Sequence, residues 1–175
     1  LATISSSSIT LFMIFGGFLV VSGAGDFVIE LSKVVAGRTR GGAAFVAVIS
    51  SALTGTISGS AIANTASTGV ITIPLMKSNG FRAKFAAGVE AAASTGGQLM
   101  PPIMGAGAFV MASYTSIPYG TIVAVSVVPA MLYFLSVAFI VRIEAVKYQV
   151  GNEIDLKINR GKLLSGALVF VLPLG

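Results

Sequence analysis

The chain of 175 residues contains no cysteine and no histidine, and only 10% of its residues are charged. Without cysteine there is no disulfide framework and no thiol chemistry. Without histidine, and with only six acidic residues, it offers little to a transition metal, which imidazole, thiolate and carboxylate groups usually bind. We therefore expect no transition-metal centre, no organic cofactor and no enzymatic activity.

Hydrophobic residues are abundant instead, at 55% of the chain, and the mean hydropathy is +0.94. Both values indicate an integral membrane protein that lies in a lipid bilayer. The net charge of +5 is a feature of many nucleic-acid-binding proteins. Here, however, the basic residues lie in short clusters between apolar segments, where they indicate membrane topology, so we expect no nucleic-acid partner.

The apolar segments predict an all-α polytopic domain. A first span covers about 9–36, and an apolar stretch at about 41–76 follows, with a basic cluster on each side. Two crossings would need roughly 40 apolar residues plus a turn, so this stretch is too short for two, and small polar residues at 55–69 interrupt it. A re-entrant helical hairpin resolves the conflict, because it returns the chain to its starting side and leaves both basic clusters in the cytoplasm.

The segment at about 83–114 is predicted to be a broken span, because Gly96-Gly97 and Pro101-Pro102 interrupt it and proline removes a backbone donor and clashes with the preceding turn. We expect the chain to be a fragment of one domain. Its remaining segments are a span at about 118–141, a cytoplasmic linker at 142–162 and the start of another span at 163–175.

The two interruptions are the most informative feature of the sequence. Backbone groups freed by a broken helix find no water in lipid, so such breaks occur only where protein surrounds them or a cavity is lined. Paired, interrupted apolar segments are typical of transporter binding sites. Their Ser, Thr and Asn oxygens suit a monovalent cation such as Na⁺, whereas a divalent ion usually requires carboxylates. Alternatively, small residues such as Gly55 and Gly59 only allow close helix packing.

Asn64 and Glu90 are the individual residues that favour a site. A buried amide is costly and needs several partners, so Asn64 is favoured as a functional residue. Glu90 is a candidate functional carboxylate inside a span, but an interfacial ion pair with Arg82 or Lys84 is equally compatible with the sequence. Residues 55–59 resemble the serine loop of intramembrane proteases, with Ser58 as nucleophile, yet no histidine is present to activate it.

Three runs resemble the large permease subunit of tripartite ATP-independent periplasmic (TRAP) transporters. They are Gly-Ser-Ala-Ile-Ala-Asn at 59–64, Thr-Ile-Pro-Leu-Met-Lys at 72–77 and the longer run at 89–105 that contains Ser-Thr-Gly-Gly-Gln-Leu-Met-Pro-Pro. The likeness is to the DctM-like domain of the fused-permease, TAXI-associated branch. It implies a sodium-driven importer in the bacterial or archaeal cytoplasmic (inner) membrane, with a periplasmic binding protein, a small permease subunit or fused equivalent, and a carboxylate such as a C4-dicarboxylate as substrate.

The resemblance also implies half of an inverted-repeat, ion-transporter-type elevator fold, in which Na⁺ and substrate bind between hairpin tip and helix break. Two functional readings stay open beside it. One is a divalent-anion/sodium symporter of similar fold that needs no binding protein, and the other is an ion channel with a re-entrant loop. The implied sodium site comprises Ser60, Asn64, Thr65, Ser94, Thr95, Gly96 and Gly97. Candidate substrate contacts are Ser58, Ser67, Thr68, Pro101 and Pro102.

Overall fold

The computed structural model describes residues 10, 14, 18, 24–36 and 39–150. In this part of the chain all the regular secondary structure is helical and there is no strand, which confirms the predicted all-α class. Three predicted segments lie wholly or partly outside the described residues. They are the start of a further span at 163–175, the linker beyond residue 150, and most of the part of the first span that precedes residue 24. The helices are α3 (Ala24–Ala36), α4 (Gly42–Ser58), α5 (Ala61–Ser78), α6 (Ala83–Gly97), α7 (Ala106–Thr115) and α8 (Tyr119–Lys147).

Helices α4 and α5 form an antiparallel pair joined at Gly59 and Ser60. Gly59 ends α4 in the left-handed conformation, with φ of 60°, and its N–H donates to the Gly55 carbonyl. A side chain at this position would be blocked as well as strained, because an added Cβ would lie 2.4 Å from the Met104 carbonyl oxygen. Ser60 then caps α5, where its hydroxyl accepts from the Ala63 N–H.

The interruption is therefore much shorter than the predicted stretch at 55–69, since α5 is helical from Ala61 onwards. The physical reason is that the hydroxyls of α5 bond to carbonyls of their own helix. Ser67 and Thr68 both donate to the Asn64 carbonyl, and Thr72 donates to that of Thr68. Such back-bonding satisfies the hydroxyl without opening the helix. The small polar residues thus form a helix face instead of a loop.

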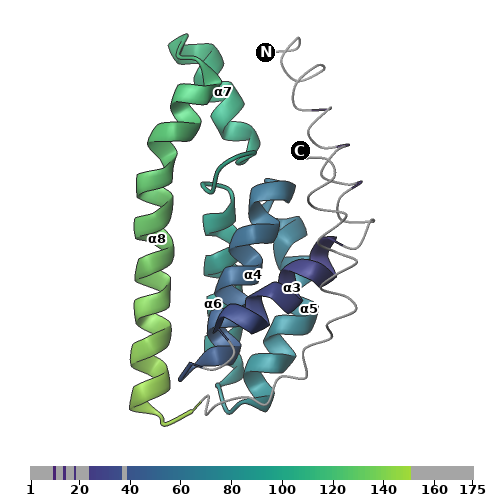
Figure 1. Ribbon diagram of the computed structural model, residues 1–175, viewed down its shortest axis with the longest axis vertical. Coiled ribbons are helices and arrows are strands. Elements are labelled where there is room, and N and C mark those ends of the chain that lie inside the picture. The colour runs from purple at the N-terminus through teal and green to yellow at the C-terminus, as the bar shows by residue number, and fades with distance from the viewer. Residues whose placement is uncertain (1–9, 11–13, 15–17, 19–23, 37–38, 151–175) are drawn as a thin grey trace.

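Residues 98–105 separate α6 from α7, within the range predicted for the broken span. The Pro101–Pro102 peptide bond is cis, and the Gly105 N–H donates to the Gln98 carbonyl across the loop at 2.8 Å. The Tyr119 hydroxyl, at the start of α8, donates to the carbonyls of Pro102 and Ile103. Hydrogen bonds thus connect the two ends of the loop to each other and its middle to α8. The loop lies beside the tip of the α4–α5 hairpin (Figure 1).

Helix α8 runs along the whole length of the described bundle (Figure 1). Its 29 residues would span about 43 Å, more than a hydrocarbon core of about 30 Å, and it is the one described helix that is long and apolar enough to cross a membrane. It continues to Lys147, so residues 142–147 of the predicted linker are helical. Helix α4 is also apolar but shorter, with 17 residues.

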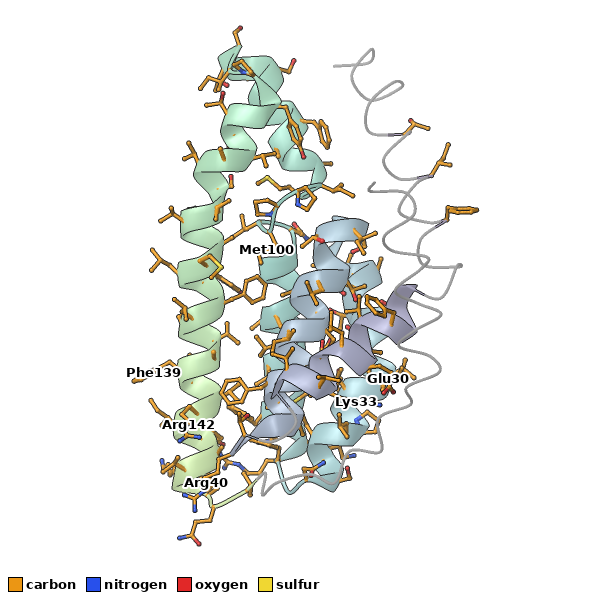
Figure 2. All side chains as sticks on the ribbon, viewed as in Figure 1. Glu30, Lys33, Arg40, Met100, Phe139 and Arg142 are labelled. Atoms are coloured by element: carbon orange, nitrogen blue, oxygen red, sulfur yellow. The ribbon has the colours of Figure 1, made fainter. Side chains whose placement is uncertain are left out.

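Helix α4 is the buried centre of the fold and packs against α3, α5 and α6. The hairpin reaches only part of the way along α8, and α7 lies beyond its tip (Figure 1). Helix α4 begins and α5 ends at the end of the bundle where α8 also ends. Arg40 and Arg142 lie at that same end (Figure 2).

Candidate functional site

A buried carboxylate joins three helices below the hairpin tip. Glu90 on α6 is 0% exposed. Its Oε1 accepts hydrogen bonds from the hydroxyls of Ser51 at 2.8 Å, Thr68 at 2.5 Å and Ser94 at 3.2 Å. Its Oε2 accepts from the hydroxyl of Thr72 at 2.5 Å. We call these five residues the Glu90 cluster.

The Glu90 cluster holds the hairpin against α6. Ser51 belongs to α4, while Thr68 and Thr72 belong to α5, so the one carboxylate bonds to both arms of the hairpin. Helix α5 approaches closely beside the carboxylate, because an added Cβ on Gly69 would lie 3.3 Å from Glu90 Cγ. A buried carboxyl group is costly unless its oxygens are hydrogen-bonded, and here both oxygens accept from hydroxyls.

Asn64 lies on the same face of α5, one turn before Thr68, and is also 0% exposed. Its Nδ2 donates to the Ser51 carbonyl at 2.7 Å, which ties it to the residue whose hydroxyl bonds to Glu90. Its Oδ1 is buried and has no hydrogen-bond partner within the described residues. The hydroxyl oxygen of Thr54 on α4 is also buried and has no hydrogen-bond partner among these residues. Unsatisfied buried groups cost about 1–3 kcal/mol each, so each of these two exceptions requires a physical explanation.

Two glycines bring the backbones of α4 and α6 into contact beside Asn64. An added Cβ on Gly55 would lie 2.5 Å from Gly97 Cα and 3.0 Å from Asn64 Nδ2. An added Cβ on Gly97 would lie 2.7 Å from Gly55 Cα and 3.3 Å from Asn64 Nδ2. No side chain fits at either position without moving a backbone. The end of α6 thus lies against α4 at the level of Asn64.

Of the residues predicted for the sodium site, the structure brings Asn64 and Gly97 together and places Ser94 in the Glu90 cluster. The others lie elsewhere. Thr95 is exposed and its hydroxyl donates to the Ala91 carbonyl, while an added Cβ on Gly96 would meet the Tyr133 ring of α8 at 2.3 Å. Ser60 and Thr65 are partly buried, the first as the cap of α5.

The predicted substrate contacts fall in two places. Ser58 lies at the hairpin tip, where its hydroxyl is within 3.5 Å of the Ser60 backbone, and Ser67 is exposed on α5. Thr68 is instead buried in the Glu90 cluster. Pro101 is partly buried and Pro102 exposed in the loop after α6.

The alternative reading of Glu90 as an interfacial partner of Arg82 or Lys84 is wrong. Glu90 bonds to hydroxyls in the interior, and Arg82 pairs instead with Glu144 of α8 at 2.7 Å. That hydrogen bond from the guanidinium to Glu144 raises the pKa of Arg82, which also lies 4.4 Å over the ring centroid of Tyr148. Arg82 thus joins the start of α6 to the end of α8, away from the cluster.

Three buried polar residues of the site were not predicted from the sequence: Ser51, Thr54 and Thr72. A signal for Thr72 was present, because Asn64, Thr68 and Thr72 are spaced four apart and so share one face of a helix. Ser51 and Thr54 lie in an otherwise apolar helix, where a hydroxyl commonly bonds to its own backbone. The position of Ser51 against Glu90 of α6 and Thr68 of α5 follows only from the packing.

Comparisons with known proteins place the chain among membrane transport components. A family model described as "Tripartite ATP-independent periplasmic transporter, DctM component" matches residues 1–175. The chain is similar to the C4-dicarboxylate TRAP transporter large permease protein DctM of Pseudomonas aeruginosa, with 31% identity over 96% of this chain and 40% of the relative. The corresponding protein of Vibrio cholerae is 31% identical over 79% of this chain and 30% of the relative.

A third relative has a different substrate in its name. It is the 2,3-diketo-L-gulonate TRAP transporter large permease protein YiaN of Escherichia coli, which is 27% identical over 54% of this chain and 22% of its own length. The chain spans less than half the length of the curated relatives it matches.

Proposed function

Because the chain belongs to the DctM component family of TRAP transporters, as its sequence motifs predicted, we propose that it is part of the transmembrane permease subunit of a sodium-coupled importer of organic acids. The family is one of transporters and not of enzymes, in agreement with the expectation of no catalysis. The substrate is proposed to be a carboxylate, since the names of the relatives include C4-dicarboxylate and 2,3-diketo-L-gulonate transporters.

The observation that carries the proposal is the buried, unpaired Oδ1 of Asn64 between the hairpin and the end of α6. An amide oxygen is a neutral ligand that suits Na⁺, and half-helix ends with their free carbonyls are where transporters bind coupling ions. Helix α6 ends at Gly97, which lies beside Asn64. Its last carbonyls each accept one N–H of residues 98–100, and a carbonyl oxygen keeps a second lone pair that can coordinate a cation. This arrangement fits a monovalent cation.

The residues proposed to hold Na⁺ are Asn64 and the buried end of α6 at Ser94 and Gly97. Among the described residues, the hydrogen bonds and ion pairs of Glu90 and Asn64 include no lysine or arginine, so no basic side chain already neutralises this region. Sodium would supply a positive charge next to the Glu90 cluster. The proposed site does not include the predicted members Ser60, Thr65, Thr95 and Gly96.

We further propose that α4 and α5 form a re-entrant hairpin within half of an inverted-repeat elevator fold. Three observations support it: the hairpin tip lies part of the way along α8, both open ends lie near Arg40 and Arg142, and the break between α6 and α7 lies beside the tip (Figures 1 and 2). In an elevator, the hairpin and α6 must move together. The Glu90 cluster supplies the connection, because it bonds α6 to both arms.

The proposed partners are a periplasmic binding protein that delivers the substrate and a small permease subunit, separate or fused, in the inner membrane of a bacterium or archaeon. The test is uptake of labelled C4-dicarboxylate into proteoliposomes that contain the complete permease. Uptake should require both a sodium gradient and the binding protein. Uptake that is independent of both would contradict the proposal.

The Asn64→Ala variant tests the site itself. It should abolish sodium-stimulated uptake while membrane insertion stays intact, because the unpaired amide oxygen is lost. The matched control is Asn79→Ala, which removes an amide from the opposite end of α5, where its Nδ2 only bonds to the Leu75 carbonyl and the Ser78 hydroxyl. Equal sodium activation of the two variants would count against the site.

A further inference from the structure

A groove between α6 and α8 has no role in the proposed transport site. Its volume is about 300 Å³. Five residues on one face of α6 line it, spaced as helical neighbours, and two residues of α8 form the opposite wall. The lining consists of Lys84, Phe85, Gly88, Val89 and Ala92 from α6, with Val137 and Ile140 from α8.

Lys84 is the only charged residue of this lining and lies at the end where α6 begins. A second hollow adjoins it there and shares Lys84 and Phe85 with the groove, adding Arg82. Arg82 is already engaged with Glu144 and Tyr148. The Lys84 ammonium, by contrast, is exposed and forms no hydrogen bond or ion pair with any part of the chain that the structure describes. The groove is thus apolar along its length and has an uncompensated positive charge at one end.

We propose that this groove binds an anionic phospholipid, with an acyl chain along the apolar lining and the phosphate of the headgroup at Lys84. The charge is complementary to a phosphate. Lys84 lies in the first turn of α6, which the Arg82–Glu144 ion pair joins to the end of α8. Arg40 and Arg142 lie at that end (Figure 2), which is the proposed cytoplasmic face, where a headgroup would be. The volume of the groove also favours a lipid acyl chain over a protein helix as its occupant. A helix about 10 Å across would fill 300 Å³ in less than one turn.

Gly88 provides a way to close the groove without disturbing the fold. An added Cβ there meets nothing within 4 Å, so Gly88→Leu fills the groove with its side chain, and leucine is a better helix former than glycine. Gly107 on α7 is equally open and lies outside the groove. Gly107→Leu is therefore the matched control, and Lys84→Gln removes only the charge.

The test is native mass spectrometry of the complete permease, purified in detergent and mixed with phosphatidylglycerol or phosphatidylethanolamine. The wild type and Gly107→Leu should retain phosphatidylglycerol in preference to phosphatidylethanolamine. Lys84→Gln should lose the preference for the anionic lipid, and Gly88→Leu should retain at least tenfold less of it. Unchanged retention in both groove variants would overturn the proposal.

A second measurement identifies the occupant directly. A photo-crosslinking residue at Ile140 should label lipid in vesicles that contain phosphatidylglycerol. Labelling of a protein segment instead would show that another part of the permease covers the groove, and would overturn the proposal. Neither measurement involves sodium or transport, so the outcome is independent of the proposed coupling mechanism.

Discussion

Substitution of Glu90 tests whether its carboxylate holds the hairpin to α6. In Glu90→Ala the side chain is lost from a fully buried position, and four hydroxyls lose their acceptor. Thr68 and Thr72 keep carbonyl acceptors in their own helix at 2.8 and 3.0 Å. Ser51 keeps the Thr68 hydroxyl at 3.2 Å, whereas Ser94 has no alternative partner among the described residues. One unsatisfied hydroxyl and a cavity together predict a loss of about 2–5 kcal/mol in folding free energy.

Glu90→Gln should be much milder. Its remaining oxygen can accept from the three hydroxyls that now bond to Oε1, while its amide group can donate to the Thr72 hydroxyl, which still donates to the Thr68 carbonyl. The expected loss is about 1–2 kcal/mol, the difference between hydrogen bonds to a charged and to a neutral acceptor. Sodium-stimulated uptake should therefore persist in Glu90→Gln and fail in Glu90→Ala.

The assay is thermal unfolding of the complete permease in detergent, followed by uptake in proteoliposomes. The control is Glu144→Gln, which breaks the partly exposed ion pair with Arg82 and should change the unfolding temperature little. The order of stability should be wild type, then Glu90→Gln, then Glu90→Ala. If Glu90→Ala unfolds at the wild-type temperature, the carboxylate does not tie the three helices together.

Three further predictions concern the hairpin. Gly97→Ala should separate the end of α6 from α4 and raise the sodium concentration for half-maximal uptake, because its Cβ would lie 2.7 Å from Gly55 Cα. The control for both uptake and folding is Gly107→Ala, whose Cβ has no atom within 4 Å. Gly59→Ala should cost more than about 1 kcal/mol in thermal unfolding, since φ is 60° and its Cβ would lie 2.4 Å from a carbonyl; a neutral effect would mean that tip and break do not touch. Thr72→Val should cost about 1 kcal/mol through the lost bond to Glu90, whereas Thr95→Val, on the exposed face of α6, should leave the unfolding temperature unchanged.

Much of this arrangement could be predicted from local sequence signals. The proline pair at 101–102 disfavours a continuous helix, and the structure separates α6 from α7 there, whereas the paired glycines at 96–97, also predicted to interrupt the span, are the last residues of α6. Asn64 was identified because a buried amide in an apolar segment is costly, and the structure places it in the interior. These signals act within a few residues, so a single sequence reveals them.

What depends on packing between helices could not be predicted. The side chains of α5 bond to its own carbonyls, so a stretch that resembles a break continues as helix. Gly96 faces Tyr133 of α8 while its neighbour Gly97 faces Asn64, a distinction that only the relative rotation of the helices determines. Glu90 had two readings of equal merit until the positions of Ser51 and Thr72 showed its partners.

The central claim is that the chain enters the membrane at α4 and leaves on the same side after α5. The chain contains no native cysteine, so Arg40→Cys and Lys77→Cys introduce unique labelling positions in this region. A membrane-impermeant thiol reagent applied to inside-out vesicles should label both variants, and neither should react in right-side-out vesicles. Labelling of the two positions from opposite sides would mean that the segment at 42–78 crosses the membrane a single time, and would contradict the account.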